Sequence, residues 1–276
     1  MLLNLGGGFL MAENYKGIEY ETILAWVEEG IGYLQFNRPK AFNAVNYKLL
    51  IESIEALNFF SVDPEVKAII ICGNENAFAA GADLKFVSGF SAFEARDFLD
   101  KVHECMFAIE DNHKPTIAAV RGLALGGGLE TVMACDIHIM ADNCTLGLPE
   151  INLGIFPGAG GTQRLPRITS LNIAKQYIMT GDFFDAATAY RIGLANIVVP
   201  AEEVMGQALK FAKKFAKKSP IALREAKNSI NNSMNYDIKA GCRAEQIAWS
   251  MLFSSEDQKE GMNAFLEGRK AVFKGK

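Results

Sequence analysis

The chain has 276 residues, of which 50% are hydrophobic, so it can build a sizeable core in one large domain or two small ones. With 28 Lys and Arg against 32 Asp and Glu, its formal net charge is -4, which gives no reason to expect a nucleic-acid partner or an anionic membrane surface. The five cysteines contain no C-x-x-C pair and mostly stand among apolar residues, which predicts reduced thiols that serve in packing.

The first residues, MLLNLGGGFLMAEN, carry no Lys or Arg before a short apolar run, which argues against a secretory signal. We expect residues 1–14 to be a disordered extension. No run in the chain approaches the ~18 apolar residues that a membrane span needs. The sequence therefore predicts a cytoplasmic protein with no membrane partner.

Predicted elements begin with alternating apolar and polar residues on both sides of Gly30, over residues 21–37, which indicate a β-hairpin. Residues 46–60 then place leucines and isoleucine at helical spacing behind Asn46, a residue type that caps helix starts. We therefore expect a helix to follow the hairpin.

Apolar strands and a capped helix come next along the chain. Residues 67–73 and 116–122 are apolar over strand length, and residues 135–142 also fit a strand. Between the first two, residues 91–111 open with Ser91 and Glu94 in the register of a capping box. Strands that alternate with helices predict an α/β domain.

The second half of the chain is mostly helical in pattern. Residues 150–166, EINLGIFPGAGGTQRLP, are glycine-rich and predict a loop, whereas Asp185 to Arg191 fits a capped helix closed by Gly193. From about Glu202 the pattern is helical, with breaks at KSP and SSE. We expect an α/β core over residues 15–200 and a helical region over residues 201–276.

The stretch KFAKKFAKKSP in this helical region contains five lysines around two phenylalanines. Such spacing is typical of the solvated face of an amphipathic helix. A contact with phosphate or nucleic acid is the alternative. The lysines are Lys210, Lys213, Lys214, Lys217 and Lys218.

Several common sites are absent from the sequence. The glycine clusters do not spell the G-x-G-x-x-G fingerprint of dinucleotide-binding proteins, and no P-loop occurs. The three histidines lack zinc spacing and have no G-x-S-x-G partner. We therefore expect neither a metal site nor a serine hydrolase.

The segment GLALGGGLETVMACD, residues 122–136, combines three glycines with one carboxylate, Glu130, in apolar surroundings. Glycines let the backbone approach a ligand closely, and the free N–H groups at a helix start can hold a developing negative oxygen. Glu130 would lie one turn into that helix, where a dry site tunes its proton affinity. The alternative is a carboxylate that only favours the helix dipole.

A second carboxylate, Glu150, stands in another apolar loop, directly after Pro149. Two carboxylates beside an oxyanion-binding site suit general acid–base chemistry on a carbonyl compound. A third segment, AFAAGADLK, offers another place near Gly81 where a backbone N–H can be exposed.

Together, AFAAGADLK, GLALGGGLETVMACD and LPEINLGIFPGAGGTQRLPR resemble the enoyl-CoA hydratase/isomerase family, the crotonases. The resemblance runs in order from about Ile18 and includes LQFNRPKAFNAVN and EDQKEGMNAFLEGRK. It implies a spiral of ββα units with a helical C-terminal region that serves trimer formation. A homotrimer, or a homohexamer made of two trimers, is the assembly that it implies.

The resemblance also implies a site. An acyl-CoA thioester carbonyl would be held between the backbone N–H groups of Ala82 and Gly127. Coenzyme A would enter as part of the substrate, and no metal or redox cofactor would be needed. The residues expected to contact the substrate are Ala80, Ala82, Asp83, Leu84, Lys85, Gly126 and Phe265. Many relatives have a lysine where this chain has Gly268, so a contact from this position to the phosphates of coenzyme A is not expected, and Arg269 or Lys270 is the alternative source of that contact.

The presence of both glutamates points within the family to a hydratase, which adds water syn and reversibly to a trans-2-enoyl-CoA to give a 3-hydroxyacyl-CoA. Glu130 would activate the water and Glu150 would deliver the proton to C2. The alternatives are a Δ3,Δ2-enoyl-CoA isomerase that uses Glu150 alone, and a non-catalytic, RNA-binding or scaffold member. The sequence leaves acyl chain length open, and a short-chain substrate such as crotonyl-CoA follows from its frequency in the family.

Overall fold

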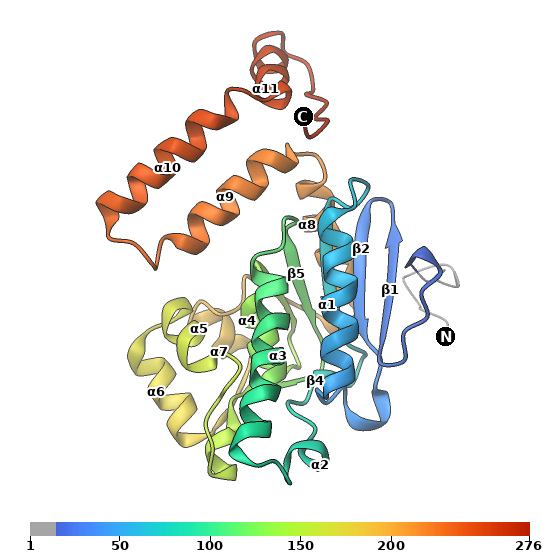
Figure 1. The fold of residues 1–276 in the computed structure, drawn as a ribbon, viewed down its shortest axis with the longest axis vertical. Coiled ribbons are helices and arrows are strands. Elements are labelled where there is room, and N and C mark those ends of the chain that lie inside the picture. Colours follow the sequence, from blue (N-terminus) through green and yellow to red (C-terminus); the bar gives the residue numbers. More distant parts are fainter. Residues whose placement is uncertain (1–14) are drawn as a thin grey trace.

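Two β-sheets and the helices that cover them form the body of the computed structural model, which describes residues 15–276 (Figure 1). The expected extension, residues 1–14, lies outside the described residues. The α/β class predicted from the sequence is confirmed, and it is consistent with a spiral of ββα units that ends in a helical region.

The larger sheet begins with the predicted hairpin, in which β1 and β2 pair antiparallel around Gly30. Its remaining strands run parallel to β2, and three of them, β3, β5 and β7, are entirely or largely buried, as their continuous apolar sequences require. The edge strand β10 is half-buried. In spatial order the strands are β1 (Ile23–Glu28), β2 (Ile31–Phe36), β3 (Ala68–Cys72), β5 (Thr116–Val120), β7 (Ile137–Ala141) and β10 (Ile197–Val199).

After each of β3, β5 and β7 the chain forms one strand of the smaller sheet. These three strands lie side by side in the same spatial order as β3, β5 and β7. The first three strands of this sheet are parallel, and the fourth pairs antiparallel with the third. The chain therefore alternates between the sheets and winds forward by one strand in each at every turn. The strands are β4 (Ala77–Ala79), β6 (Leu123–Leu125), β8 (Thr145–Gly147) and β9 (Phe183–Asp185).

Three of the helices before the C-terminal region begin at side-chain caps that the sequence predicted, namely Asn46, Ser91 and Asp185. The side chain of Asn46 accepts a hydrogen bond from the Leu49 N–H, and Ser91 forms the expected capping box with Glu94. The helices are α1 (Tyr47–Val62), α2 (Leu84–Val87), α3 (Ala92–Glu110), α4 (Gly127–Ala134), α5 (Gly161–Ile168), α6 (Leu171–Thr180) and α7 (Ala186–Arg191).

One expectation in this part of the chain is wrong. Helix α5 begins at Gly161, inside the stretch that was predicted to be loop, and it contains Pro166. Gly160 supplies no capping side chain at its start. The helix is instead capped by a residue far away in sequence, so no local pattern indicates it.

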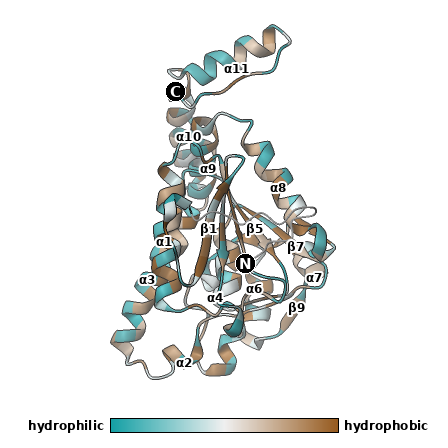
Figure 2. Ribbon diagram, turned by 90° about the vertical axis from the view of Figure 1, so that its right-hand side faces the viewer, coloured by the Kyte–Doolittle hydropathy of each residue, from teal (hydrophilic) through white to brown (hydrophobic). Residues whose placement is uncertain are grey.

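Helix α8 (Val204–Phe215) covers the larger sheet on the face opposite α1 and α3 (Figure 2). Val204, Ala208 and Ala212 are fully buried against the core, and all five lysines of the KFAKKFAKKSP stretch are exposed. Although the sequence assigned residues 201–276 to one helical region, α8 is therefore part of the core layer. Lys210, Lys213 and Lys214 lie on the exposed face of this amphipathic helix, whereas Lys217 and Lys218 follow its end.

Three further helices extend away from the sheets, and they are α9 (Pro220–Asn232), α10 (Ile238–Leu252) and α11 (Glu256–Leu266) (Figure 1). Lys227 fastens α9 to the core, because its buried ammonium pairs with the Asp136 carboxylate at 2.9 Å and donates to the Ile109 carbonyl at 3.3 Å. Asn231 adds a hydrogen bond from its amide to the Glu110 carbonyl, at 3.0 Å. Helices α10 and α11 expose many large apolar side chains, among them Trp249.

Four of the five cysteines are buried as free thiols, in agreement with a packing role, and Cys242 on α10 is exposed. Burial raises the pKa of the Cys72 thiol to about 12, so it stays protonated at neutral pH. Within residues 15–276, no helix combines the length and the apolar character that crossing a membrane requires.

Replacing Lys227 by Met should lower the free energy of unfolding by about 3 kcal/mol, measured by urea denaturation at fixed protein concentration. Methionine fills the same space, but it leaves Asp136 without its cation in a largely buried place. The matched control is Lys213→Met, which breaks an exposed pair with Glu29 and should change stability little. Equal effects of the two substitutions would contradict this role of Lys227.

Candidate active site

Three segments singled out in the sequence meet at one edge of the smaller sheet. Ala82 follows β4, Gly127 follows β6, and Glu150 follows β8. Because these strands are parallel neighbours, their carboxyl ends lie side by side. The packing there is very close, since a Cβ added to Gly128 would lie only 2.0 Å from the Ala79 carbonyl oxygen. The topology therefore brings residues nearly 70 positions apart into one site.

The backbone N–H groups of Ala82 and Gly127 donate no hydrogen bond to any residue in the described range, 15–276. Their neighbours in sequence are held firmly. Val45 donates to the Gly81 carbonyl at 2.7 Å and accepts from the Asp83 N–H at 2.8 Å, and the Gly126 N–H donates to the Gly147 carbonyl at 2.9 Å. Both free groups belong to half-buried residues, so they are available to a ligand.

The two free groups also lie near each other. A Cβ added to Gly126, the residue before Gly127, would lie 3.6 Å from the Cα of Gly81, the residue before Ala82. A Cβ added to Gly127 itself would meet no atom within 4 Å, so this part of the backbone borders open space. Paired backbone donors beside open space are the geometry that an oxyanion requires.

Arg38 and Asn43, which the sequence analysis did not single out, support the segment that carries Ala82. The buried Asn43 amide donates to the carbonyls of Ala77 and Phe78, at 2.9 and 3.2 Å. Arg38 forms an ion pair with Asp83 at 2.9 Å. Both residues lie in NRPKAFNAVN, so the resemblance of that segment to the crotonases was the available signal. The Asp83 carboxylate, expected to line the substrate, is therefore engaged by Arg38.

Glu130 is 2% exposed and lies one turn into α4. Its Oε1 accepts a hydrogen bond of 2.6 Å from the Gly161 N–H, at the first residue of α5. The pKa of Glu130 is raised to about 7, because burial and the charge of Glu150 raise it by more than the backbone N–H groups of Gly161 and Ala159 and the charge of Arg164 lower it. Glu130 therefore lies in the first turn of α4, where the helix dipole favours a carboxylate, and it also binds the start of α5.

Glu150 lies on the short 3-10 helix η3 (Pro149–Leu153) and is half-buried. Its Oε1 faces the main chain of Gly126, where an added Cβ would lie only 2.8 Å away. Gly126 has φ +50°, so glycine is required there for both conformation and space. Oε2 of Glu150 is buried without a hydrogen-bond partner within residues 15–276. Burial raises the pKa of this carboxyl, which favours its protonated form.

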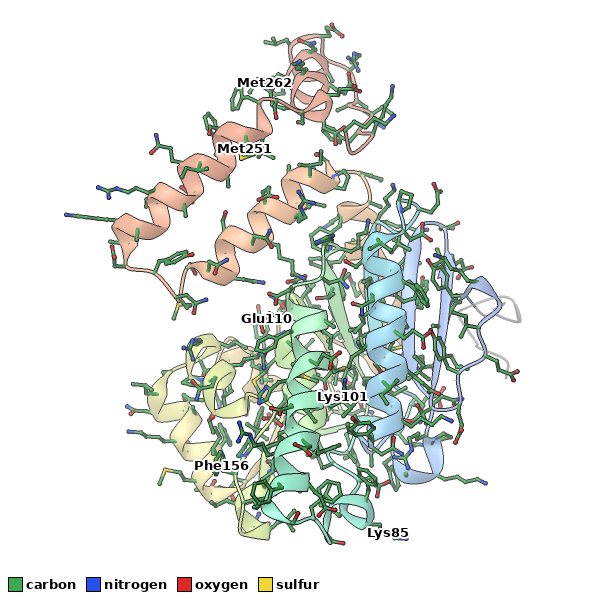
Figure 3. All side chains as sticks on the ribbon, viewed as in Figure 1. Lys85, Lys101, Glu110, Phe156, Met251 and Met262 are labelled. Atoms are coloured by element: carbon green, nitrogen blue, oxygen red, sulfur yellow. The ribbon has the colours of Figure 1, made fainter. Side chains whose placement is uncertain are left out.

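The other residues expected to contact substrate are less closely gathered. Ala80 is half-buried beside Ala82, and Leu84 and Lys85 are exposed on α2, where Lys85 is labelled in Figure 3. Phe265 is 85% exposed on α11, at the end of the molecule opposite α2 (Figure 1). The fold of one chain therefore does not bring Phe265 to the site, and its expected contact through a neighbouring subunit stays a prediction.

Metal-binding side chains do not gather in the described part of the chain. No group of three or more His, Cys, Asp or Glu residues there is arranged to hold a metal ion. The polar groups that converge on the site are thus two carboxylates and two backbone amides.

Comparisons with known proteins extend over nearly the whole chain. The model of the enoyl-CoA hydratase/isomerase family matches residues 27–276. A crotonyl-CoA hydratase of Syntrophomonas wolfei is 45% identical over 255 residues, which cover 92% of this chain and 98% of that protein. A short-chain-enoyl-CoA hydratase of Clostridium acetobutylicum is 41% identical over 254 residues, which cover 92% and 97%. The crystal structure of an enoyl-CoA hydratase from Bacillus anthracis has a TM-score of 0.89 at 36% identity, and covers 93% of this chain and 100% of that chain.

The raised pKa of Glu130 predicts a pH-dependent stability difference for Glu130→Gln. Between the pKa of an unfolded glutamate, about 4.5, and the folded value of about 7, the unfolded chain loses this proton while the folded chain keeps it. Rising pH across this window therefore destabilises the wild type, whereas glutamine does not titrate and can still accept from Gly161. Measured by urea denaturation, the stability of the variant relative to wild type should increase from pH 5 to pH 8 by on the order of 2 kcal/mol. A constant difference would contradict the raised pKa.

Proposed function

The chain belongs to the enoyl-CoA hydratase/isomerase family and is an enzyme of the enoyl-CoA hydratase type, and from this premise we propose how its residues carry the reaction. Members of the family act on acyl-CoA thioesters. The reaction is the reversible addition of water to a trans-2-enoyl-CoA, which gives a 3-hydroxyacyl-CoA. The mechanism rests above all on one observation, two free backbone donors beside the buried Glu130 and the half-buried Glu150.

In the proposed mechanism the N–H groups of Ala82 and Gly127 bind the thioester oxygen. Attack of water on C3 moves the π electrons of the double bond toward the carbonyl, so negative charge develops on that oxygen. Preorganised amides stabilise this charge without reorganising, and loss of one such donor costs ~3–4 kcal/mol in a well-studied protease. Support comes from the free state of both amides and from the open space beside Gly127.

Glu130 acts as the base and Glu150 as the acid. Glu130 takes a proton from the attacking water as its oxygen bonds to C3, and Glu150 gives its proton to C2 as the enolate returns to the thioester. The Gly161 N–H favours the ionised form of Glu130, while the unpartnered Oε2 of Glu150 favours its protonated form. Because the two groups interact, one proton belongs to the pair, and which residue holds it changes during the reaction.

We propose that the reaction uses no cofactor beyond coenzyme A, which is part of the substrate. Every charge and proton in the proposed steps is handled by the two amides and the two carboxyl groups. No electron transfer occurs, because hydration changes no overall oxidation state of the substrate.

A short acyl chain is the proposed substrate class. Its support is that two relatives with more than 40% identity carry the names crotonyl-CoA hydratase and short-chain-enoyl-CoA hydratase. Rates measured over a series of enoyl-CoA chain lengths should be highest for crotonyl-CoA or its nearest homologues.

We also propose that the chain assembles as a homotrimer or homohexamer through its C-terminal helices. Large apolar side chains are exposed there, and an interface between subunits would cover them. They include Ile230, Tyr236, Ile238, Ile247, Trp249, Phe265 and Leu266. In such an assembly Phe265 can reach the acyl pocket of a neighbour.

Glu130→Gln and Glu150→Gln should each lower turnover of crotonyl-CoA by about 10²–10⁴-fold, the range for a positioned acid or base. Hydration is followed by the loss of absorbance of the conjugated thioester. The matched control is Glu104→Gln on the exposed surface of α3, which should keep the wild-type rate. A near wild-type rate in either site variant would remove that residue from the mechanism.

The isomerase alternative is tested with the same proteins. An isomerase that uses Glu150 alone would leave crotonyl-CoA unchanged, would turn over a 3-enoyl-CoA, and would tolerate Glu130→Gln. A hydratase loses its crotonyl-CoA activity in both glutamate variants.

Gly127→Pro should abolish turnover, because proline lacks the N–H that binds the thioester oxygen. Gly127 is the first residue of α4, a position where proline is tolerated, so the variant should fold. Gly127→Ala keeps the N–H, and its Cβ meets no protein atom, so it should retain far more activity than the proline variant. Circular dichroism checks the fold, and a folded, fully active proline variant would exclude this amide from the oxyanion site.

A further inference from the structure

Arg164 on α5 is a largely buried cation, with its side chain only 11% exposed. Its Nη1 donates to the Ala159 carbonyl at 3.1 Å, and its Nη2 forms an ion pair with the Glu110 carboxylate. Its Nε has no hydrogen-bond partner in the described part of the chain. Burying a guanidinium is costly and a buried ion pair adds little net stability, so stability alone does not explain this placement.

The guanidinium lies directly on the segment that holds Glu130, residues 159–161. Gly160 has φ +103°, and a Cβ there would lie 2.1 Å from Nη1 of Arg164, so only glycine lets the cation pack against this main chain. On one side of Gly160, Arg164 holds the Ala159 carbonyl. On the other side, the Gly161 N–H holds the Glu130 carboxylate.

Glu110 links this arrangement to the rest of the protein. It is near the end of α3 that faces α9, where Figure 3 labels it, and its own carbonyl accepts from Asn231. The aromatic ring of Phe107, one turn earlier on α3, lies 6.0 Å from the guanidinium carbon. Arg164 is therefore held by Glu110 and Phe107 of α3 on one side, and on the other side it binds the main chain of residues 159–161.

We propose that Arg164 is a positioning residue for the hydration reaction: anchored by Glu110, it fixes residues 159–161 so that the Gly161 N–H is presented to the Glu130 carboxylate. The inference rests on the proposed role of Glu130 as the base. Arg164 does not touch the reacting atoms and acts through the backbone segment and through its charge.

The positive charge of Arg164 shifts the pKa of nearby carboxyl groups in one direction, downward. It lowers the pKa of Glu130, against burial and against the charge of Glu150. The other acids near the guanidinium are Glu110, its ion-pair partner, and Asp111, whose pKa it also lowers. Removing the cation should therefore raise the pKa of Glu130 and demand a higher pH for the ionised base.

The test is Arg164→Met, assayed for crotonyl-CoA hydration across pH. We expect kcat to fall by ~10–100-fold, as for a misplaced catalytic group, with a much smaller change in KM. The acid limb of the kcat/KM profile should move to higher pH. Arg164→Lys keeps the positive charge but lacks the forked donors of the guanidinium. Compared with Arg164→Met, it should therefore return the acid limb toward its wild-type position more fully than it returns kcat toward the wild-type value.

The matched control is Arg167→Met on the same helix. Arg167 is exposed, and within residues 15–276 its side chain bonds only to Gln163, so its loss should leave both kcat and the pH profile unchanged. Arg164→Met with a wild-type rate and an unmoved limb would overturn the proposal. If Arg164→Met does not fold, Glu110→Gln is tested in its place. The charge of Arg164 is then uncompensated, so the acid limb of the kcat/KM profile should move to lower pH. An unmoved limb would overturn the proposal.

A double substitution separates this inference from the proposed function. If Arg164 acts through Glu130, Arg164→Met should reduce the residual rate of Glu130→Gln far less than it reduces the wild-type rate. An equal reduction in both backgrounds would overturn the positioning role while leaving Glu130 in the mechanism. Wild-type turnover by Glu130→Gln alone would instead refute the proposed role of Glu130.

Discussion

The hydrogen bond from the Gly161 N–H to the Glu130 carboxylate is the contact on which the site depends. It joins the first turn of α4 to the first residue of α5 across 31 positions of sequence. For α5 it replaces the capping side chain that Gly160 cannot supply, and for Glu130 it favours the ionised form inside an apolar core. One interaction therefore stabilises the helix start, fixes the carboxylate and offsets part of the cost of burying its charge.

The alternation of the chain between two sheets explains why the site forms where it does. In each turn of the spiral the chain forms one short strand of the smaller sheet. Because these strands are parallel, the segment that follows each of them begins at the same edge of that sheet. The first such segment contributes Ala82, the second contributes Gly127 and Glu130, and the third contributes Glu150. Close packing at Gly126 and Gly128 then sets the separation of these groups within tight limits, because any side chain there would meet backbone or carboxylate.

Local rules predicted much of the fold. The hairpin, the caps at Asn46 and Ser91 and the long buried strands follow from patterns within a few residues, and all are present. The three-residue strands β4, β6 and β8 are too short to show a period, so their separate sheet was not visible. The start of α5, the ion pair of Arg38 with Asp83 and the contacts of Arg164 depend on partners distant in sequence. Both glutamates were found because a carboxylate in an apolar segment is unusual, whereas Phe265 lies far from the site of its own chain.

The free donors of Ala82 and Gly127 belong to the main chain, and this has a consequence for how such a protein changes over generations. Every amino acid except proline carries the same N–H group, so any substitution at these positions other than proline leaves the donor itself in place. The two acids, in contrast, are side chains that one nucleotide change can replace. Under the proposed mechanism, a lineage with this architecture can therefore exchange its proton-transfer groups and explore other transformations of a thioester while inheriting its means of stabilising an enolate.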